Sequence, residues 1–194
     1  MFLKFLKYPI KVKSKSIANY QKDNIEMVEQ VEIYPESKIF YAQPKTIEKN
    51  NVFSQREVIV PQLNVNIIKK GKCYTRNGLV LTSDNVLIKD CTPVFPHPLA
   101  NKRHYKFQKC ETILGSVAVL TNDSCQKNYY HWLIENASRL HLIDKSGVEI
   151  DKYIINNECS YQKRILDCLG VPLKKLSLLI QIDLFKLIIW LFQV

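Results

Sequence analysis

The chain has 194 residues, of which 46% are hydrophobic and 24% are charged. This length and this hydrophobic content are enough for an ordinary domain with a buried core, which argues against a disordered chain. The formal net charge of +10, from 28 Lys and Arg against 18 Asp and Glu, favours anionic partners such as nucleotide diphosphates, nucleic acid or acidic lipids. No nucleic-acid-binding motif accompanies the charge, so a nucleic-acid partner is not expected.

The first 28 residues are basic and only weakly periodic, and we expect a loosely ordered lead-in there. Lys4 and Lys7 interrupt the apolar residues at the start of the chain, which argues against a secretory signal peptide. Two interpretations remain for this segment. It is either a solvated terminus or a short basic amphipathic stretch that rests on an anionic membrane surface.

Six cysteines are scattered along the chain without a CxxC pair and without a histidine at zinc-ligand spacing. We therefore expect reduced thiols, which suit a cytoplasmic protein better than a secreted disulfide scaffold, although the even count leaves the scaffold open. The expected location is the cytoplasm, either in solution or peripherally at the inner face of the membrane.

Short β-favouring runs follow the lead-in and are separated by proline and other turn-forming residues. They occupy residues 31–34, 38–42, 57–60 and 65–68. The clearest hairpin lies between Gly78 and Lys89, where two apolar runs flank the turn-forming Ser83-Asp84-Asn85. We therefore expect several short strands and a well-registered hairpin in the first half of the chain.

From Ser116 onward the pattern changes to β-α-β-α. Apolar runs at 117–120 and 153–155 alternate with helical segments that begin near Asn128 and Ser160. Parallel strands need crossover connections, usually helices. This alternation therefore predicts an α/β fold in which helices pack on a parallel sheet.

The segment from Asn128 to Arg139, Asn-Tyr-Tyr-His-Trp-Leu-Ile-Glu-Asn-Ala-Ser-Arg, is the strongest candidate for a functional site. A helix advances by about 100° per residue, and an arc of about 80° then contains four polar side chains: Asn128, His131, Glu135 and Arg139. The opposite side is predicted to face the core and contains Tyr130, Leu133, Ile134, Ala137 and Leu140. Trp132 and His141 are also expected in the core. Ligands in open α/β sheets gather at the carboxyl ends of strands, where this helix is predicted to begin.

Spacing alone leaves two interpretations of this polar stripe. In the first, Asn128 is the N-cap and His131 caps or packs near the helix start, while Glu135 and Arg139 form an exposed ion pair that contributes less than about 1 kcal/mol. In the second, His131 is a general base, because an imidazole with a pKa of about 6.5 is largely neutral at pH 7. Glu135 then either holds the imidazole tautomer or is itself the base, and Arg139 presents a planar fork suited to phosphate.

The sequence from Asn128 to Leu142 resembles the signature of glycosyltransferase family 61, which includes bacterial capsular polysaccharide biosynthesis proteins. The hairpin at 78–82, the run at 115–120 and the segments 151–155 and 166–172 extend the resemblance over roughly residues 70–176. The resemblance implies transfer of a sugar from a nucleotide-sugar donor to an acceptor hydroxyl, with inversion. It also implies a GT-B enzyme, in which two Rossmann-like domains face a cleft. This chain would then contain the N-terminal half.

Inverting sugar transfer needs a base for the acceptor proton and positive charge for the departing diphosphate. On the resemblance, His131 and Glu135 are the expected catalytic residues, and Arg139 and Asn128 the expected substrate-binding residues. No Asp-x-Asp occurs, so no metal or other cofactor is expected. The expected partners are a nucleotide-sugar donor and a glycan or other hydroxyl acceptor. The alternative is a non-catalytic binding or assembly protein of polysaccharide synthesis at an anionic membrane surface.

Residues 177–194 form an apolar tail of about the length of a membrane span. Asp183 and Lys186 would each make insertion unfavourable by about 2.5 to 3.5 kcal/mol. The tail is therefore a spanning helix, a buried strand and helix, or an end left exposed because the product stops before its packing partner. Members of the family continue past residue 176. We therefore expect a glycosyltransferase-like domain at 29–176, followed by the start of a truncated second half.

Overall fold

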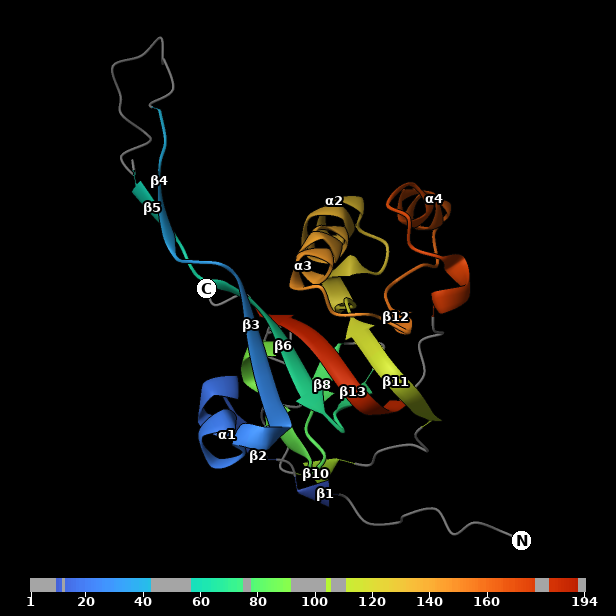
Figure 1. The fold of residues 1–194 in the computed structure, drawn as a ribbon. Coiled ribbons are helices and arrows are strands. Elements are labelled where there is room, and N and C mark those ends of the chain that lie inside the picture. The colour runs from blue at the N-terminus through green and yellow to red at the C-terminus, as the bar shows by residue number, and fades with distance from the viewer. Residues whose placement is uncertain are drawn as a thin grey trace, which may run out of the picture.

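The computed structural model describes residues 10–11, 13–42, 57–74, 78–91, 104–105, 111–176 and 182–191. Its architecture is mixed α/β. Helices cover one face of a large sheet, while α1 (Ile17–Asp23) and a group of short strands cover the other face (Figure 1). Within these residues, no helix has the length and apolar content needed to cross a membrane.

Five strands of the main sheet lie side by side in the order β12, β11, β13, β6 and β3. β11 is parallel to both β12 and β13, whereas β6 runs antiparallel to β13 and to β3. The predicted parallel pairing of the β-α-β unit is therefore confirmed, but antiparallel strands extend it into a mixed sheet. The bounds are Val28–Tyr34 for β3, Leu63–Lys69 for β6, Glu111–Val119 for β11, Lys152–Ile154 for β12 and Ile182–Leu191 for β13.

A chain of shorter strands continues the sheet from the start of β13 through β7, β8 and β9 to β2. The predicted hairpin is confirmed, because β8 and β9 are antiparallel and Leu81 lies opposite Leu87. Two small sheets stand apart, β1 with β10 and β4 with β5, and the second of these projects away from the main sheet (Figure 1). The bounds are Ile10–Lys11 (β1), Lys13–Lys15 (β2), Ser37–Phe40 (β4), Glu57–Val60 (β5), Lys72–Tyr74 (β7), Leu79–Leu81 (β8), Val86–Ile88 (β9) and His104–Tyr105 (β10).

Strand β13 comes from the apolar tail and occupies the middle of the main sheet. Its residue Leu187 lies opposite Val117 of β11 on one side and opposite Ile68 of β6 on the other. A spanning helix and an exposed end are therefore wrong for Ile182–Leu191. The expected domain boundary at residue 176 is also wrong, since this strand belongs to the same sheet as the strands before it.

The expected loose lead-in is wrong from Lys13 onward, because β2 and α1 follow at once. The carboxylate of Asp90 accepts a hydrogen bond from the backbone N–H of Ile17 at 2.8 Å, which satisfies a free donor at the start of α1. Ile17 and Tyr20 are each 2% exposed and pack into the core. The seven-residue α1 is thus stabilised by tertiary contacts that local periodicity does not reveal.

Side chains of the main sheet alternate between two core clusters, one on each face. In β11, Val117 and Val119 belong to the cluster that contains Ile17 and Tyr20 of α1. Ala118 points the other way, into the cluster formed with the helices. The strand is therefore buried on both faces, as expected for the central part of an α/β sheet.

Asp151, which precedes β12, ties the two parallel strands together. Its Oδ2 accepts hydrogen bonds from the backbone N–H of Ser116 at 2.8 Å and from Ser116 Oγ at 2.9 Å. These bonds lie at an irregularity of β11, where Gly115 has a φ of +98° and an added Cβ would meet Asp151 Oδ2 at 2.3 Å. The hydrogen bonds from Ser116 hold the pKa of Asp151 below the usual carboxyl value.

We expect Asp151→Asn to destabilise the protein at neutral pH and to have little effect in acid. The pKa of Asp151 is lower in the folded than in the unfolded chain. The ionised carboxylate therefore stabilises the fold above the unfolded-state pKa of about 3.9, and this contribution is lost as the pH falls through the folded-state pKa. Urea unfolding of both proteins over this pH range measures the difference. If the two proteins differ in free energy of unfolding by the same amount at every pH, the ionised carboxylate of Asp151 does not stabilise the fold.

Candidate functional site

The helical segment after β11 has three continuous parts. These are α2 (Tyr129–His131), a π-helical turn (Trp132–Ala137) and α3 (Ser138–Ser146). Asn128 is the N-cap, as predicted, and its Oδ1 accepts a hydrogen bond from the backbone N–H of His131 at 3.3 Å. The segment ends at Gly147, whose φ of +67° is that of a left-handed C-cap.

The π-helical turn changes the side of the helix that faces the core. Tyr130 and Ile134, both predicted to be buried, are 65% and 53% exposed. A π turn closes its hydrogen bonds over five residues, which rotates the side chains after it relative to those before it. The predicted apolar face is therefore wrong at these positions, and the buried residues of the segment are Trp132, Asn136, Ala137, Leu142 and Ile143.

The two other residues predicted to lie in the core have opposite outcomes. Trp132 is fully buried, as predicted, and its Nε1 donates a hydrogen bond to the carbonyl oxygen of Asn156 at 2.7 Å. His141 is exposed, so the core prediction is wrong for it, and its Nε2 makes a hydrogen bond with the hydroxyl of Tyr34 at 2.8 Å.

His131 and Glu135 meet side by side at the start of the segment. His131 Nδ1 makes a short hydrogen bond with Glu135 Oε1, as the spacing of four residues allows. The two side chains are 39% and 36% exposed. The pair is therefore held in place by the protein while remaining open to a ligand.

The loop after β11 fixes the second oxygen of the Glu135 carboxylate. Oε2 accepts hydrogen bonds from Asn122 Nδ2 at 3.0 Å and from Ser124 Oγ at 3.3 Å. The thiol of Cys125 lies 3.8 Å from the same oxygen. Asn122 is only 1% exposed, and its Oδ1 accepts a hydrogen bond from the backbone N–H of Cys125. Oδ1 also lies 2.7 Å from Ser124 Oγ, whose single hydroxyl proton is shared between Oδ1 and Glu135 Oε2. Both carboxylate oxygens are thus oriented by donors.

These contacts determine the tautomer of His131. Burial would raise the pKa of Glu135, but the hydrogen bonds from His131 and Asn122 outweigh it and hold the pKa below the usual carboxyl value. An ionised carboxylate only accepts hydrogen bonds, so Nδ1 must carry a proton. In the neutral ring the lone pair then lies on Nε2. Among the described residues, no hydrogen bond engages Nε2.

Arg139 lies one further turn along the helix and is not an exposed surface residue. Its Nε is buried, and burial lowers the pKa of its guanidinium, while the nearby groups of Cys125, Glu135 and Cys91 act in the opposite direction. The prediction of an exposed Glu135–Arg139 ion pair is therefore wrong. The guanidinium is instead buried near Glu135, whose charge counteracts the effect of burial on the pKa of the guanidinium.

A buried amide cluster anchors the helical segment to the ends of β11 and β12. Asn156 Oδ1 accepts hydrogen bonds from Thr121 Oγ1 at 2.8 Å and from Asn136 Nδ2 at 3.0 Å. All three residues are at most 2% exposed. Two other atoms of the cluster, Asn136 Oδ1 and Asn156 Nδ2, are buried without a hydrogen-bond partner among the described residues.

Gly78, at the start of the hairpin, lies against the end of β11. It has a φ of +66°, and an added Cβ would lie 2.1 Å from the carbonyl oxygen of Thr121. The hairpin therefore approaches the loop that carries Asn122 more closely than any side chain allows.

We expect Gly78→Ala to lower the free energy of unfolding by about 1–3 kcal/mol more than Gly147→Ala. Both glycines have nearly the same positive φ, but the space around Gly147 is open. The control therefore measures the backbone strain alone, and the additional loss at Gly78 measures the clash with Thr121. Chemical denaturation of both variants provides the comparison. Equal losses of stability in the two variants would show that the loop at Thr121 shifts to make room for the added methyl group without destabilising the protein.

The site lies at the carboxyl end of β11, where the strand order reverses. The chain passes from β11 to β12 on one side and returns through α4 (Ser160–Cys168) to β13 on the other side. Figure 1 shows the arrow of β11 ending beneath the helical segment. Ligands in open α/β sheets bind at such reversal points, outside the carboxyl ends of the strands.

Four side chains were predicted for the site, and the structure brings His131 and Glu135 into contact and places Arg139 near Glu135. Asn128 is used as a cap. Asn122, Ser124 and the buried amide cluster were missed. For Asn122 and Ser124 the only signal is a polar run, Thr121-Asn122-Asp123-Ser124, directly after an apolar one.

In the described ranges, no three His, Cys, Asp or Glu side chains gather as a metal site requires. Comparison with protein-family models, with curated proteins and with solved structures gave no match. The chemistry of the site therefore has to be argued from its own geometry.

Proposed function

We propose that the chain contains the N-terminal, Rossmann-like half of an inverting GT-B glycosyltransferase of family 61. It would transfer a sugar from a nucleotide-sugar donor to an acceptor hydroxyl, in surface polysaccharide synthesis. The observation that carries this proposal is the contact of His131 Nδ1 with an ionised Glu135, which leaves Nε2 able to accept a proton. The resemblance of residues 128–142 to the family signature supports it.

In the proposed reaction, the acceptor hydroxyl donates a hydrogen bond to His131 Nε2. Its oxygen attacks the anomeric carbon, its proton passes to Nε2, and the bond between the sugar and the diphosphate breaks. The carboxylate of Glu135 stabilises the imidazolium that forms, and Asn122 keeps this carboxylate in place. No oxidant or reductant is required.

In the proposed reaction, the guanidinium of Arg139 stabilises the negative charge of the departing diphosphate. Low-dielectric surroundings strengthen the attraction between a guanidinium and a phosphate. Asn128 is exposed, but its Oδ1 is engaged by the helix N-terminus. Its part in substrate binding is therefore limited to its amide donors. The reaction needs no metal in this scheme.

The test is a transfer assay with labelled nucleotide sugars and a mixture of glycan acceptors. GT-B enzymes bind much of the donor with their second domain, so the assay uses this chain both alone and joined to such a domain. We expect nucleotide release coupled to labelled product. If no donor is consumed in either form, the proposal fails, and the alternative of a non-catalytic assembly protein gains support.

A further inference from the structure

The outer end of the helical layer exposes large apolar side chains. α4 and the 3-10 turn after it (Leu173–Lys175) lie on the β12 side of the molecule, away from β3 (Figure 1). Leu169 and Leu173 are 53% and 51% exposed there. Isolated exposed leucines need no explanation, but contiguous apolar surface marks an interaction site.

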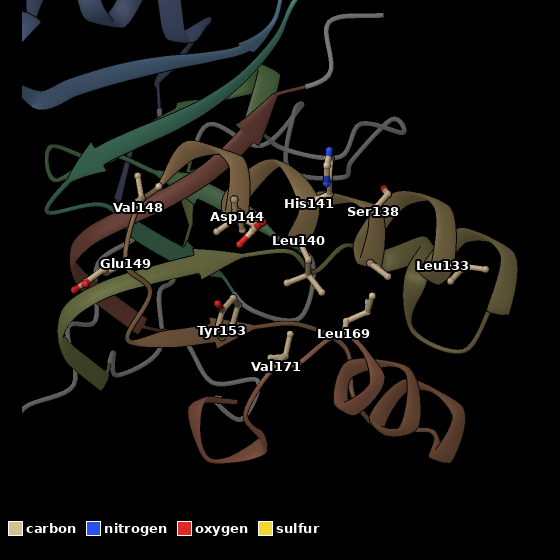
Figure 2. A pocket seen from close by; sticks show the side chains of 14 residues that line it. Leu133, Ser138, Leu140, His141, Asp144, Val148, Glu149, Tyr153, Leu169 and Val171 are labelled. Carbon is tan, nitrogen blue, oxygen red and sulfur yellow. The ribbon is translucent and has the colours of Figure 1, made fainter.

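An open groove of about 710 Å³ continues this apolar surface into the helical layer. Figure 2 shows Leu169 and Leu133 at one end of the groove, whereas Asp144 and Glu149 lie toward the other end. The uncharged end therefore opens beside the exposed Leu169. The other apolar lining residues include Leu140, Tyr153 and Val171.

The segment that contains these two leucines has more cations than carboxylates. Between Ser160 and Leu176 the chain has one carboxylate, that of Asp167, and four cations, which are Lys163, Arg164, Lys174 and Lys175. The first three cations are exposed, whereas Lys175 turns back and donates a hydrogen bond to a backbone carbonyl of the protein. This segment thus exposes both apolar side chains and cations that can contact an anionic surface.

We propose that this α4 surface, formed by Lys163, Arg164, Leu169, Leu173 and Lys174, docks on an anionic lipid bilayer. The cations would lie among the lipid phosphates, and the two leucines would enter the boundary between headgroups and acyl chains. The charge of the surface selects anionic over neutral lipids, and the uncharged end of the groove adds apolar area beside Leu169. This inference does not depend on the transfer reaction.

The test is co-sedimentation of the full chain with vesicles. We expect binding to vesicles of phosphatidylcholine mixed with phosphatidylglycerol, but not to phosphatidylcholine alone, and weaker binding as the salt rises to about 0.5 M. The double variant Lys163→Gln/Lys174→Gln lowers the partition coefficient about thirtyfold, and Leu169→Gln/Leu173→Gln about tenfold. All four positions are exposed, so circular dichroism and thermal unfolding remain unchanged.

A matched control carries the same kinds of substitution at the α1 end of the molecule, Lys22→Gln/Ile25→Gln. Both side chains are exposed, Ile25 to 76%, and this variant binds as the parent does. Three results would overturn the proposal: no binding to anionic vesicles, an equal loss in the control, or a loss caused by Lys4→Gln/Lys7→Gln while the α4 variants still bind. Sedimentation velocity without vesicles completes the test. If the chain self-associates and Leu169→Gln abolishes this self-association, the α4 surface binds a second copy of the chain and not a membrane.

Discussion

Replacing His131 with glutamine is expected to lower kcat/KM for sugar transfer by about 10²- to 10⁴-fold. The glutamine amide still donates a hydrogen bond to Glu135, so the local structure is kept. It has no group that accepts a proton at neutral pH. Initial rates with the best donor and acceptor measure the effect, and an unchanged circular dichroism spectrum shows that the fold is intact.

The control for this prediction is His141→Gln. His141 lies ten residues further along the same helical segment and contacts Tyr34 rather than a carboxylate. The rate of this variant should stay within about twofold of the parent, because the side chain takes no part in proton transfer. If both variants retain full activity, His131 is not the base. If both lose activity equally, the loss reflects the helix and not the imidazole.

Replacing Trp132 with alanine is expected to lower the free energy of unfolding by about 3–5 kcal/mol. Trp132 is the largest fully buried side chain of the described residues, and its ring packs edge-on against Tyr161 at a centroid distance of 5.8 Å. The substitution also leaves the buried carbonyl of Asn156 without its donor. Urea or guanidinium unfolding of the variant measures the loss.

Two further variants separate the contributions at Trp132. Trp132→Phe keeps an aromatic ring and loses the hydrogen bond to Asn156, so we expect an intermediate loss of about 1–3 kcal/mol. Tyr130→Ala, two residues earlier at a 65% exposed position, is expected to change stability by less than about 1 kcal/mol. A loss at Trp132→Ala no larger than that at Tyr130→Ala would contradict the buried position of the tryptophan.

The strands, the hairpin and the β-α-β-α order could be predicted because each is encoded locally, by apolar runs and by the turn-forming residues between them. β13 could not be placed in the same way. The run at 182–191 has the residues of a strand, but its position between β11 and β6 depends on pairing with segments more than sixty residues earlier in the chain. Short α1 was missed for a related reason. Its N-cap is local, because Ser16 Oγ accepts a hydrogen bond from the backbone N–H of Asn19, but its bond to Asp90 and the burial of Ile17 and Tyr20 depend on distant parts of the chain.

The site was predicted in part. The spacing of His131 and Glu135 still brings the two side chains into contact, although Glu135 lies within the π-helical turn. The core-facing side of the segment was predicted at about 100° per residue, and the π-helical turn breaks that regular advance, so Tyr130 and Ile134 are exposed. The donors Asn122 and Ser124 and the amide Asn156 come from other elements, so no pattern within the helical segment identifies them as partners of Glu135 and Asn136.

The most direct test of the site is the tautomer of His131, which long-range ¹H–¹⁵N correlation NMR reports without any substrate. For the neutral ring we expect the proton on Nδ1 and the lone pair on Nε2, and a loss of that preference in Glu135→Gln. His141, which has no carboxylate partner among the described residues, serves as the internal reference. A ring protonated on Nε2 in the parent protein would contradict the role of His131 as the base.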